Sequence, residues 1–252
     1  MGRDFIIGDL HGCYGQLLEK FEKANFDPEV DRVFSVGDLT DRGPESYRCL
    51  QLINEPWFHS VLGNHETMLL QFFGARNSHE SWVRDFYING GTWIEKICEE
   101  QLEQVMLLAH GKMLEIPLRL TVRHQAGDFD LVHAQFWDRR AFADEIPYDP
   151  LYEAMLTWGR SLIFQALRRA EPSTRERINE LFYQGKKEIV HIEPAHDPER
   201  RLTYVGHSVV RVPILTRSHL FIDTGAYEKH LNRISSHSGE LTMIDHATKK
   251  LY

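Results

Sequence analysis

Cysteine is scarce in this sequence: Cys13, Cys49 and Cys98 are the three examples, and they form no C-x-x-C pair. Separated thiols argue against a disulfide scaffold and against a zinc knuckle, and they are typical of a cytoplasmic protein. Long apolar runs are also missing, and none approaches the roughly 18 residues that a membrane-spanning helix needs. An acidic cluster begins within nine residues of the start, which leaves no room for a signal peptide. We therefore expect a cytoplasmic protein with no membrane partner.

An excess of positive charge is absent as well, because 29 Lys and Arg side chains face 37 Asp and Glu side chains, giving a net charge of −8. Nucleic-acid binding depends on cationic side chains that release counterions from the phosphate backbone. The composition therefore argues against nucleic acid as a partner. Low-complexity tracts are absent too, and 252 residues that are 42% apolar can bury one large core. We expect a single domain over residues 1–252.

Short apolar runs alternate with amphipathic helical patterns along the chain. The helix expected over 16–24 has Leu17 and Phe21 on one face and Lys20 and Lys23 on the other. This alternation favours an α/β fold built from βαβ units. Strands are expected at 5–7, 33–36, 58–62, 118–122, 130–132, 202–205, 220–222 and 241–244. Helices are expected at 16–24, 45–53, 66–73, 81–112 with a break at Gly90-Gly91, and 149–167 with Trp158 and Arg160 inside it.

Residues 168–201 differ from the rest of the chain. Arg, Glu, Lys, Pro and His dominate this stretch, and apolar residues are sparse. The composition predicts an exposed helix followed by a loop. Together with the end of the preceding helix, we interpret the segment 163–201 as a cap or surface insertion.

Polar clusters with glycine neighbours follow five of the expected strands. The first three read Gly-Asp-Leu-His-Gly, Gly-Asp-Leu-Thr-Asp-Arg-Gly and Gly-Asn-His-Glu, and the last two each place a histidine after a strand. Taken alone, each cluster is also explained by a helix cap, a solvated turn or a structural histidine. One functional site shared by all five clusters explains the pattern better than five independent structural roles. The candidate site residues are Asp9, His11, Asp38, Asp41, Arg42, Asn64, His65, His133 and His207.

The residue types and their spacing point to metal chemistry. Asp9 and His11 are two residues apart, so on an extended segment they face the same side and can bind one divalent ion. The carboxylate of Asp38 has two oxygens and can bridge two ions. A mixture of carboxylate, amide and imidazole ligands suits Mn²⁺, Fe²⁺ or Zn²⁺ better than Mg²⁺ or Ca²⁺. The pattern indicates an enzyme that uses two metal ions to hydrolyse a phosphate ester.

The order of these motifs resembles the phosphoprotein phosphatase branch of the calcineurin-like metallophosphoesterases, most of all the bacteriophage lambda type of serine/threonine protein phosphatase. The resemblance covers about residues 4–245 and implies a β-sandwich flanked by helices, in four αββα layers, with the metals at the strand ends. Besides the clusters above, it rests on Leu39-Thr40-Asp41-Arg42-Gly43-Pro44, Pro56-Trp57-Phe58 and Ile222-Asp223-Thr224-Gly225-Ala226.

The resemblance also implies which residues hold the metals. Two divalent ions are implied, with Mn²⁺ as the first expectation and Fe²⁺ or Zn²⁺ as alternatives, and they would generate a bridging hydroxide for direct in-line attack on phosphorus. Asp9 and His11 would hold the first ion, Asp38 would bridge both, and Asn64, His133 and His207 would hold the second.

Four further residues receive catalytic roles from the same resemblance. His65 would protonate the leaving oxygen, and Asp41 would orient its imidazole ring. Arg42 and Arg160 would bind the phosphoryl oxygens, because the planar guanidinium fork matches a phosphate group.

One position departs from the family pattern. Many members carry arginine directly before Gly-Asn-His, where this chain has Leu62. The branch that hydrolyses diadenosine tetraphosphate symmetrically tends to have leucine there, but it usually has Asp in place of Glu66 and tends to lack Thr40-Asp41. We therefore predict a serine/threonine protein phosphatase that hydrolyses phosphate monoesters in phosphoproteins or phosphopeptides, with a symmetrical dinucleoside polyphosphate hydrolase as the alternative. A non-catalytic binding module is disfavoured, because no ligand is missing.

Overall fold

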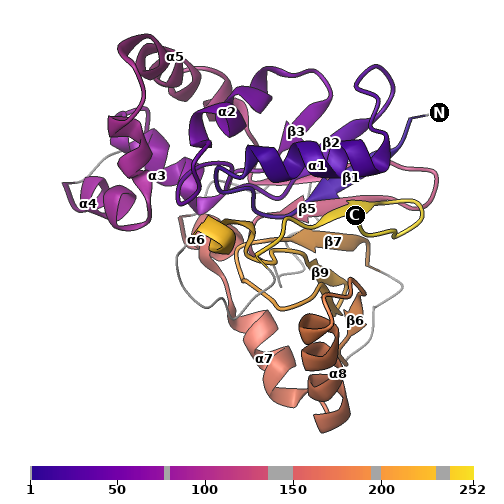
Figure 1. The fold of residues 1–252 in the computed structure, drawn as a ribbon. Helices are drawn as coiled ribbons and strands as arrows, with labels where there is room; N and C mark the ends of the chain where they lie inside the picture. The colour runs from indigo at the N-terminus through magenta and orange to yellow at the C-terminus, as the bar shows by residue number, and fades with distance from the viewer. Residues whose placement is uncertain (1, 77–79, 136–149, 194–199, 231–238) are drawn as a thin grey trace.

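Two β-sheets packed face to face form the centre of the molecule, and helices cover the outer face of each sheet (Figure 1). The computed structural model describes residues 2–76, 80–135, 150–193, 200–230 and 239–252. This arrangement of four layers is the αββα sandwich that the sequence predicts.

The first sheet has the strand order β10-β1-β2-β3. Strands β1 (Asp4–Ile7), β2 (Arg32–Ser35) and β3 (Phe58–Ser60) run parallel, and β10 (Met243–Asp245) runs antiparallel to β1. Phe5 and Ile7 pack towards α1 (Tyr14–Ala24), whereas Ile6 packs towards the second sheet. Because β1 is buried on both faces, its sequence reads as the continuous apolar run Phe5-Ile6-Ile7.

The second sheet has the strand order β4-β5-β7-β9-β8-β6. Its strands are β4 (Arg119–Val122), β5 (Phe129–Val132), β6 (Val190–His191), β7 (Leu202–Val205), β8 (Ile214–Thr216) and β9 (His219–Phe221). Strands β5, β7 and β9 are parallel neighbours. Phe34, Leu131, Tyr204 and Leu220 belong to the apolar layer between the two sheets.

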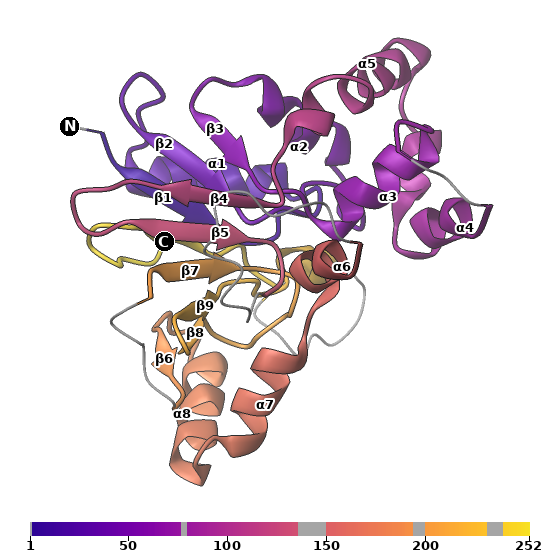
Figure 2. The same cartoon turned by 180° about the vertical axis from the view of Figure 1, so that it is seen from behind.

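The larger helices form three groups. Helix α1 covers the first sheet, while α6 (Pro150–Trp158), α7 (Ser161–Arg169) and α8 (Pro172–Tyr183) pack on the second sheet. The third group, with its own apolar core, contains α2 (Ser46–Gln51), α3 (Asn64–Phe72), α4 (Glu80–Ile88) and α5 (Glu99–Ala109). Seen from behind, α3–α5 and the pair α7–α8 lie at opposite ends of the molecule (Figure 2).

Short 3-10 helices lie at η1 (Leu52–Asn54), η2 (Gly91–Glu95), η3 (Lys112–Glu115) and η5 (Ala226–His230).

The prediction of one helix over 149–167 is wrong. Helix α6 ends at Trp158, and α7 begins at Ser161 after Arg160, whose φ of −129° is not helical. The side chain of Gln135 lies at the break: a Cβ on Gly159 would come within 2.5 Å of its Cγ. Gln135 Oε1 accepts the backbone N–H of Leu162 at 2.8 Å and so satisfies a donor in the first turn of α7. Residue 149 lies outside the described residues.

The prediction of an exposed helix and loop over 168–201 is also incomplete. Helix α8 buries Ile178 and Leu181 against the second sheet, and β6 adds an edge strand to that sheet by pairing in parallel with β8. Neither β6 nor β8 was expected, because each is only two or three residues long. The cap role of 163–201 stays a prediction, and residues 194–199 lie outside the described part.

All eight expected strands coincide with strands of the structure. The carboxyl ends of β1, β2 and β3 meet at one edge of the first sheet, and those of β5 and β7 meet at one edge of the second. The candidate site residues follow these five ends. No helix in the described ranges has the length and apolar character of a membrane span.

Candidate metal centre

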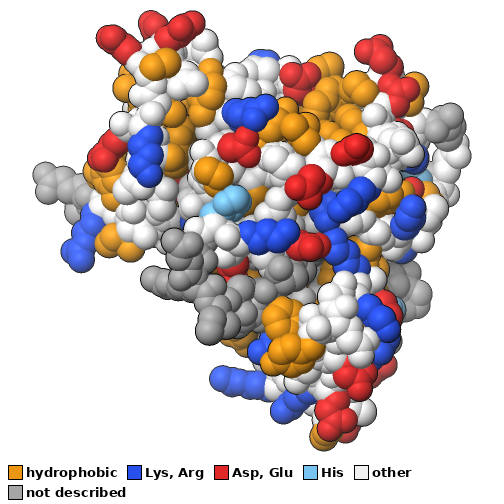
Figure 3. Space-filling model, in the orientation of Figure 1, with side chains coloured by type: hydrophobic (Ala, Val, Ile, Leu, Met, Phe, Trp, Pro, Cys, Tyr) orange, Lys and Arg blue, Asp and Glu red, His pale blue; other side chains and the backbone are white. Residues whose placement is uncertain are grey.

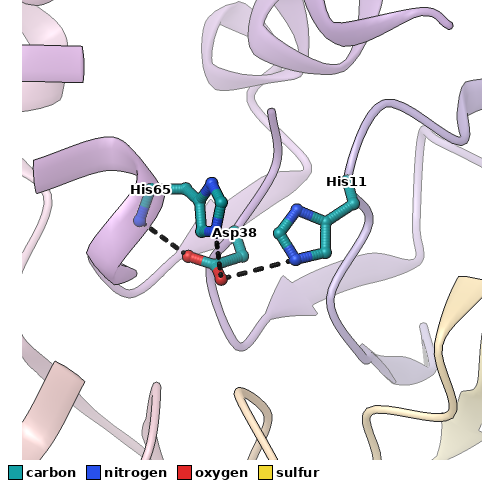
Figure 4. Close-up of side chains that lie close together, drawn as sticks. All are labelled: His11, Asp38 and His65. Atoms are coloured by element: carbon teal, nitrogen blue, oxygen red, sulfur yellow. Dashed lines mark hydrogen bonds and ion pairs between the residues drawn. The ribbon is translucent and has the colours of Figure 1, made fainter. Parts of the chain in front are cut away.

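The six predicted metal ligands converge at the ends of five strands, and all six side chains are buried. Asp38 lies in the middle: its Oδ2 is 3.5 Å from His11 Nε2 and 3.3 Å from His133 Nε2. Two groups of candidate ligand atoms share Asp38, each with its atoms within 4.8 Å of one another: His11, Asp38 and His65 in the first, and Asp38, His133 and His207 in the second. Figure 4 shows Asp38 between His11 and His65.

The two remaining predicted ligands lie beside these groups. Asp9 Oδ2 is 4.0 Å from His11 Nε2, and both Asp9 carboxylate oxygens accept the backbone N–H of His207 at 3.0–3.1 Å. Asn64, the first residue of α3, places its Oδ1 2.9 Å from His133 Nε2. Short contacts thus join five of the side chains, and the backbone N–H of His207 ties the sixth residue to them.

Backbone carbonyls fix the tautomers of two imidazoles. His11 Nδ1 donates to the carbonyl of Thr40, and His133 Nδ1 donates to the carbonyl of Val36, each at 2.8 Å. Each Nε2 therefore presents its lone pair to Asp38, as a metal-binding histidine does. His207 Nε2 is buried and has no hydrogen-bond partner among the described residues. These three nitrogen atoms suit a cation.

The electrostatics of the site also favour a cation. Burial raises the pKa of the Asp9 carboxyl, and the nearby carboxylates of Asp223 and Asp38 raise it further. Burial also acts to raise the pKa of Asp38, but the imidazoles of His133 and His65 outweigh it and hold that pKa below its usual range. Burial lowers the pKa of His207 to about 2, which keeps its ring neutral. Buried carboxylates beside imidazoles are a donor set that fits divalent cations.

The backbone at the strand ends is held in an unusual conformation. His11, Asp38, Asp41, Arg42 and His207 all have positive φ, between 40° and 72°. Side chains other than glycine rarely adopt this region, and such residues gather at functional sites. A neighbouring position has no room for a side chain, because a Cβ on residue 206 would come within 1.9 Å of Asp9 Oδ1. The loops are therefore shaped around the ligand atoms.

The four predicted catalytic residues surround this centre. His65 Nδ1 lies 2.5 Å from Asp41 Oδ2, and its Nε2 lies 3.8 Å from Asp38 Oδ2. Arg42, which is half-buried, donates from Nη1 to His11 Nε2 at 2.7 Å and from Nη2 to His65 Nε2 at 2.9 Å. Its guanidinium also lies 4.7 Å from the ring centre of Tyr227. Arg160 Nη1 donates to the backbone carbonyl of His207 at 2.8 Å, which holds it beside the second group of ligands.

The sequence analysis did not select two buried residues that support the site. Trp93 Nε1 donates to Asp41 Oδ1 at 2.6 Å, opposite the oxygen that contacts His65. Glu66 Oε2 accepts the backbone N–H groups of Asp38 and Gly63 at 2.7 and 3.0 Å, and its Oε1 accepts that of Leu39 at 2.8 Å. Glu66 therefore joins the loop that carries Asp38 to the loop that carries Asn64.

A cavity of about 540 Å³ opens beside Asn64, between α3, α4 and α6. Trp158, which is 47% exposed, lies on its wall, and its ring is 5.7 Å from the ring of His207. Most of the remaining wall is polar and includes Gln71, Asn89 and Thr157. Of the six candidate ligands, Asn64 alone lines this cavity.

Comparison with known proteins identifies relatives over most of the chain. The sequence model of a family described as calcineurin-like phosphoesterase matches residues 5–200. Serine/threonine-protein phosphatase 2 of Salmonella typhimurium is 30% identical over 226 residues, which is 88% of this chain and 87% of that protein. The symmetrical bis(5'-nucleosyl)-tetraphosphatase of Photorhabdus laumondii is 44% identical over 73 residues, 28% of this chain and 26% of that protein. The crystal structure of a candidate diadenosine tetraphosphatase shares the fold, with a TM-score of 0.59 at 17% identity over 100% of this chain and 92% of that one.

Proposed function

Because this chain belongs to the calcineurin-like phosphoesterase family, we propose that it is a metal-dependent serine/threonine protein phosphatase that hydrolyses phosphate monoesters in phosphoproteins. The observation that carries the proposal is the arrangement around Asp38. Two groups of candidate metal-binding side chains share its carboxylate, and His65, a member of the first group, has its ring held by Asp41. The relative that is similar over most of its length is named a serine/threonine-protein phosphatase, which favours this substrate class.

Two divalent ions, with Mn²⁺ as the first choice, would be held by the six buried side chains. Asp9, His11 and Asp38 would bind the first ion, and Asp38 would share the second with Asn64, His133 and His207. When bound, such ions supply a water molecule activated near neutral pH and neutralise charge on the phosphoryl group.

His65 is placed to act on the leaving group. Since Asp41 accepts the Nδ1 proton, Nε2 is the ring atom that exchanges protons with a substrate. A proton held there would pass to the ester oxygen as the bond to phosphorus breaks, and Asp41 would stabilise the ring while it is charged. Asp41 is itself held by Trp93, so the acceptor of the His65 Nδ1 proton is fixed in place.

Arg42 and Arg160 would bind the phosphoryl oxygens from two sides. A cation on His11 takes the lone pair that Arg42 Nη1 now contacts, so the guanidinium must then direct its N–H groups elsewhere. The ring of Tyr227 keeps Arg42 above the site in either case. A phosphoryl group beside the ligands offers two oxygens to the planar, bidentate fork of a guanidinium.

A second candidate function is symmetrical hydrolysis of dinucleoside tetraphosphates. Leu62 favours it, as does the similarity to the tetraphosphatase of Photorhabdus laumondii over part of the chain. Glu66 and Thr40-Asp41 favour the phosphatase.

A substrate panel separates the two. Purified protein with Mn²⁺ would be assayed on phosphoserine and phosphothreonine peptides, a phosphotyrosine peptide, p-nitrophenyl phosphate and diadenosine tetraphosphate. We expect the highest kcat/KM on the phosphoserine and phosphothreonine peptides, and loss of all turnover with a chelator or in Asp38→Asn. Nucleotide turnover orders of magnitude faster than peptide turnover would reverse the assignment, and activity that survives both treatments would refute metal-dependent hydrolysis.

A further inference from the structure

Three lysines from separate parts of the chain converge on one carboxylate. Glu240 Oε2 is 2.7 Å from Lys187 Nζ and 3.8 Å from Lys20 Nζ, and Glu240 Oε1 is 3.9 Å from Lys229 Nζ. Lys187 also donates to the backbone oxygen of Tyr252 at 3.0 Å. The cluster therefore carries more positive than negative charge, in a chain whose net charge is −8.

One member of this cluster is buried. Lys20 lies on α1 with a side chain that is only 3% exposed, although a lysine almost never leaves water completely unless it is paired. Burial, together with the neighbouring ammonium group of Lys187, lowers its pKa to about 7. Glu240 is the shared partner of three ammonium groups, so its one negative charge cannot balance their three positive charges. An anion is the missing partner that this charge distribution would accept.

A cavity of about 280 Å³ adjoins the cluster. Lys187 and Glu240 line it, and Lys186 and Arg211 add two further cations to its wall. Arg211 is turned along this wall, with its guanidinium 5.2 Å from the ring centre of Phe182. Figure 3 shows Lys and Arg side chains, with fewer carboxylates among them, over the region between α1 and α8.

The rest of the cavity wall is apolar with a polar base. Leu181, Val212 and Leu251 supply apolar surface, and the buried hydroxyl groups of Thr224 and Thr242 lie 2.7 Å apart on the same lining. The volume is close to the lower limit of small-molecule sites. None of the candidate metal ligands lines this cavity.

We propose that this cavity, with the cationic side chains of Lys186, Lys187 and Arg211 on its wall, forms a second ligand site beside the lysine cluster, which binds a small organic anion with an apolar body. The apolar part lies against Leu181 and Val212, and the anionic group lies at the lysines. A sulfonate, a carboxylate or a phosphate can supply the charge, since each offers several oxygens to ammonium donors.

Titration calorimetry with 1-hexanesulfonate, which carries no bond that a phosphatase cleaves, tests the proposal. Methanesulfonate has the charge without the body, and 1-hexanol has the body without the charge. We expect one hexanesulfonate site per chain, with both fragments binding more weakly. Lys187→Ala and Lys186→Ala should each weaken binding by about tenfold, the usual worth of a charge-assisted hydrogen bond.

Two controls keep the result specific. Lys96→Ala removes an equal charge from an exposed position that follows η2 in the α3–α5 part of the molecule, and it should leave binding unchanged. Asp38→Asn should also retain binding, because the metal centre is separate. Equal binding of hexanol and hexanesulfonate, unaltered affinity in Lys187→Ala, or loss of the site in Asp38→Asn would each overturn the proposal. Hexanoate can be titrated in the same way. Equal affinity for hexanesulfonate and hexanoate would show that the site accepts different anionic groups, as proposed.

Discussion

His65 donates its Nδ1 proton to Asp41 Oδ2 across 2.5 Å, and neither side chain is exposed to solvent. Such a pair fixes both the tautomer and the orientation of the ring. The other ring nitrogen is therefore directed to the space that Arg42 and Asp38 share. This is the geometry that a proton donor to a leaving group needs. It distinguishes His65 from His11 and His133, in which Nδ1 donates to a backbone carbonyl and Nε2 is the candidate metal ligand.

Replacing His65 by Asn should lower kcat by about 10²–10⁴-fold, the usual contribution of general acid catalysis. The loss should be large for a phosphoserine peptide and smaller for p-nitrophenyl phosphate, whose leaving group needs little protonation. Metal content, measured by elemental analysis, should stay at the wild-type level. His59→Asn, at a half-buried histidine on β3 that stacks on Phe34, is the matched control. Loss of metal in His65→Asn would instead identify His65 as a ligand.

Trp93→Phe removes the indole N–H that donates to Asp41 Oδ1 and keeps most of the ring volume. A buried carboxylate that loses one of two donors holds its partner less firmly, so we expect kcat to fall by about tenfold with KM almost unchanged. Steady-state kinetics on one phosphopeptide measures both constants. Trp57→Phe, at a partly buried tryptophan that packs against Phe21 and Phe26, should leave both unchanged. An unaltered kcat in Trp93→Phe would show that Asp41 needs no second donor.

Glu66→Gln replaces one acceptor oxygen by an NH₂ group, which cannot accept the backbone N–H groups that Glu66 now binds. The loops that carry Asp38 and Asn64 should separate, and the affinity for Mn²⁺ should fall by about 10–100-fold, as it does when a group that orients metal ligands is lost. Activity should return at high Mn²⁺ concentration. Glu45→Gln is the control, because Glu45 Oε2 accepts a backbone N–H from Gly15 far from the ligands. Wild-type Mn²⁺ affinity in Glu66→Gln would contradict the role.

Lys20→Met should stabilise the protein near neutral pH. The folded state holds the pKa of Lys20 at about 7, below the ordinary value of 10.5, so its protonated form is disfavoured by folding. The free-energy cost of burying protonated Lys20 is fully present below pH 7. It disappears as the pH rises towards 10.5, because in that range the unfolded chain keeps the Lys20 proton that the folded chain has lost. The charged groups that bear on Lys20 are Lys187, Glu240 and Lys23.

Urea unfolding of wild type and Lys20→Met at pH 6, 7 and 9.5 measures this effect. The difference in unfolding free energy between the two proteins should be largest at pH 6 and smallest at pH 9.5. Lys23→Met, at an exposed position on the same helix, should show no such trend. A gain that is independent of pH would mean that Lys20 is costly for reasons other than its charge.

The convergence of the candidate metal ligands could be predicted because the information is local. Each candidate ligand follows a short apolar run, and parallel strands bring their carboxyl ends to one edge without further detail. Asp41 and His65 were selected for the same reason. The supporting residues could not be found in this way: Trp93 lies 52 positions from Asp41, and the contacts of Glu66 depend on the path of two loops.

The errors in the fold have a similar origin. A periodic apolar pattern runs through 149–167, but the side chain of Gln135 interrupts the helix at Gly159. Lys20 was placed on the exposed face of its helix, yet the loop that contains Glu240 covers it. In both cases a residue distant in sequence overrides a local preference.

The candidate metal centre joins the two layers of the sandwich. Asp9, Asp38 and Asn64 follow strands of the first sheet, whereas His133 and His207 follow strands of the second. A cation shared by Asp38 and the two histidines would link the two sheets across an interface that is otherwise apolar. Binding of that cation would then require both sheets, since a nascent chain that stops short of β5 offers neither histidine. Once bound, the cation would oppose movement of one sheet relative to the other.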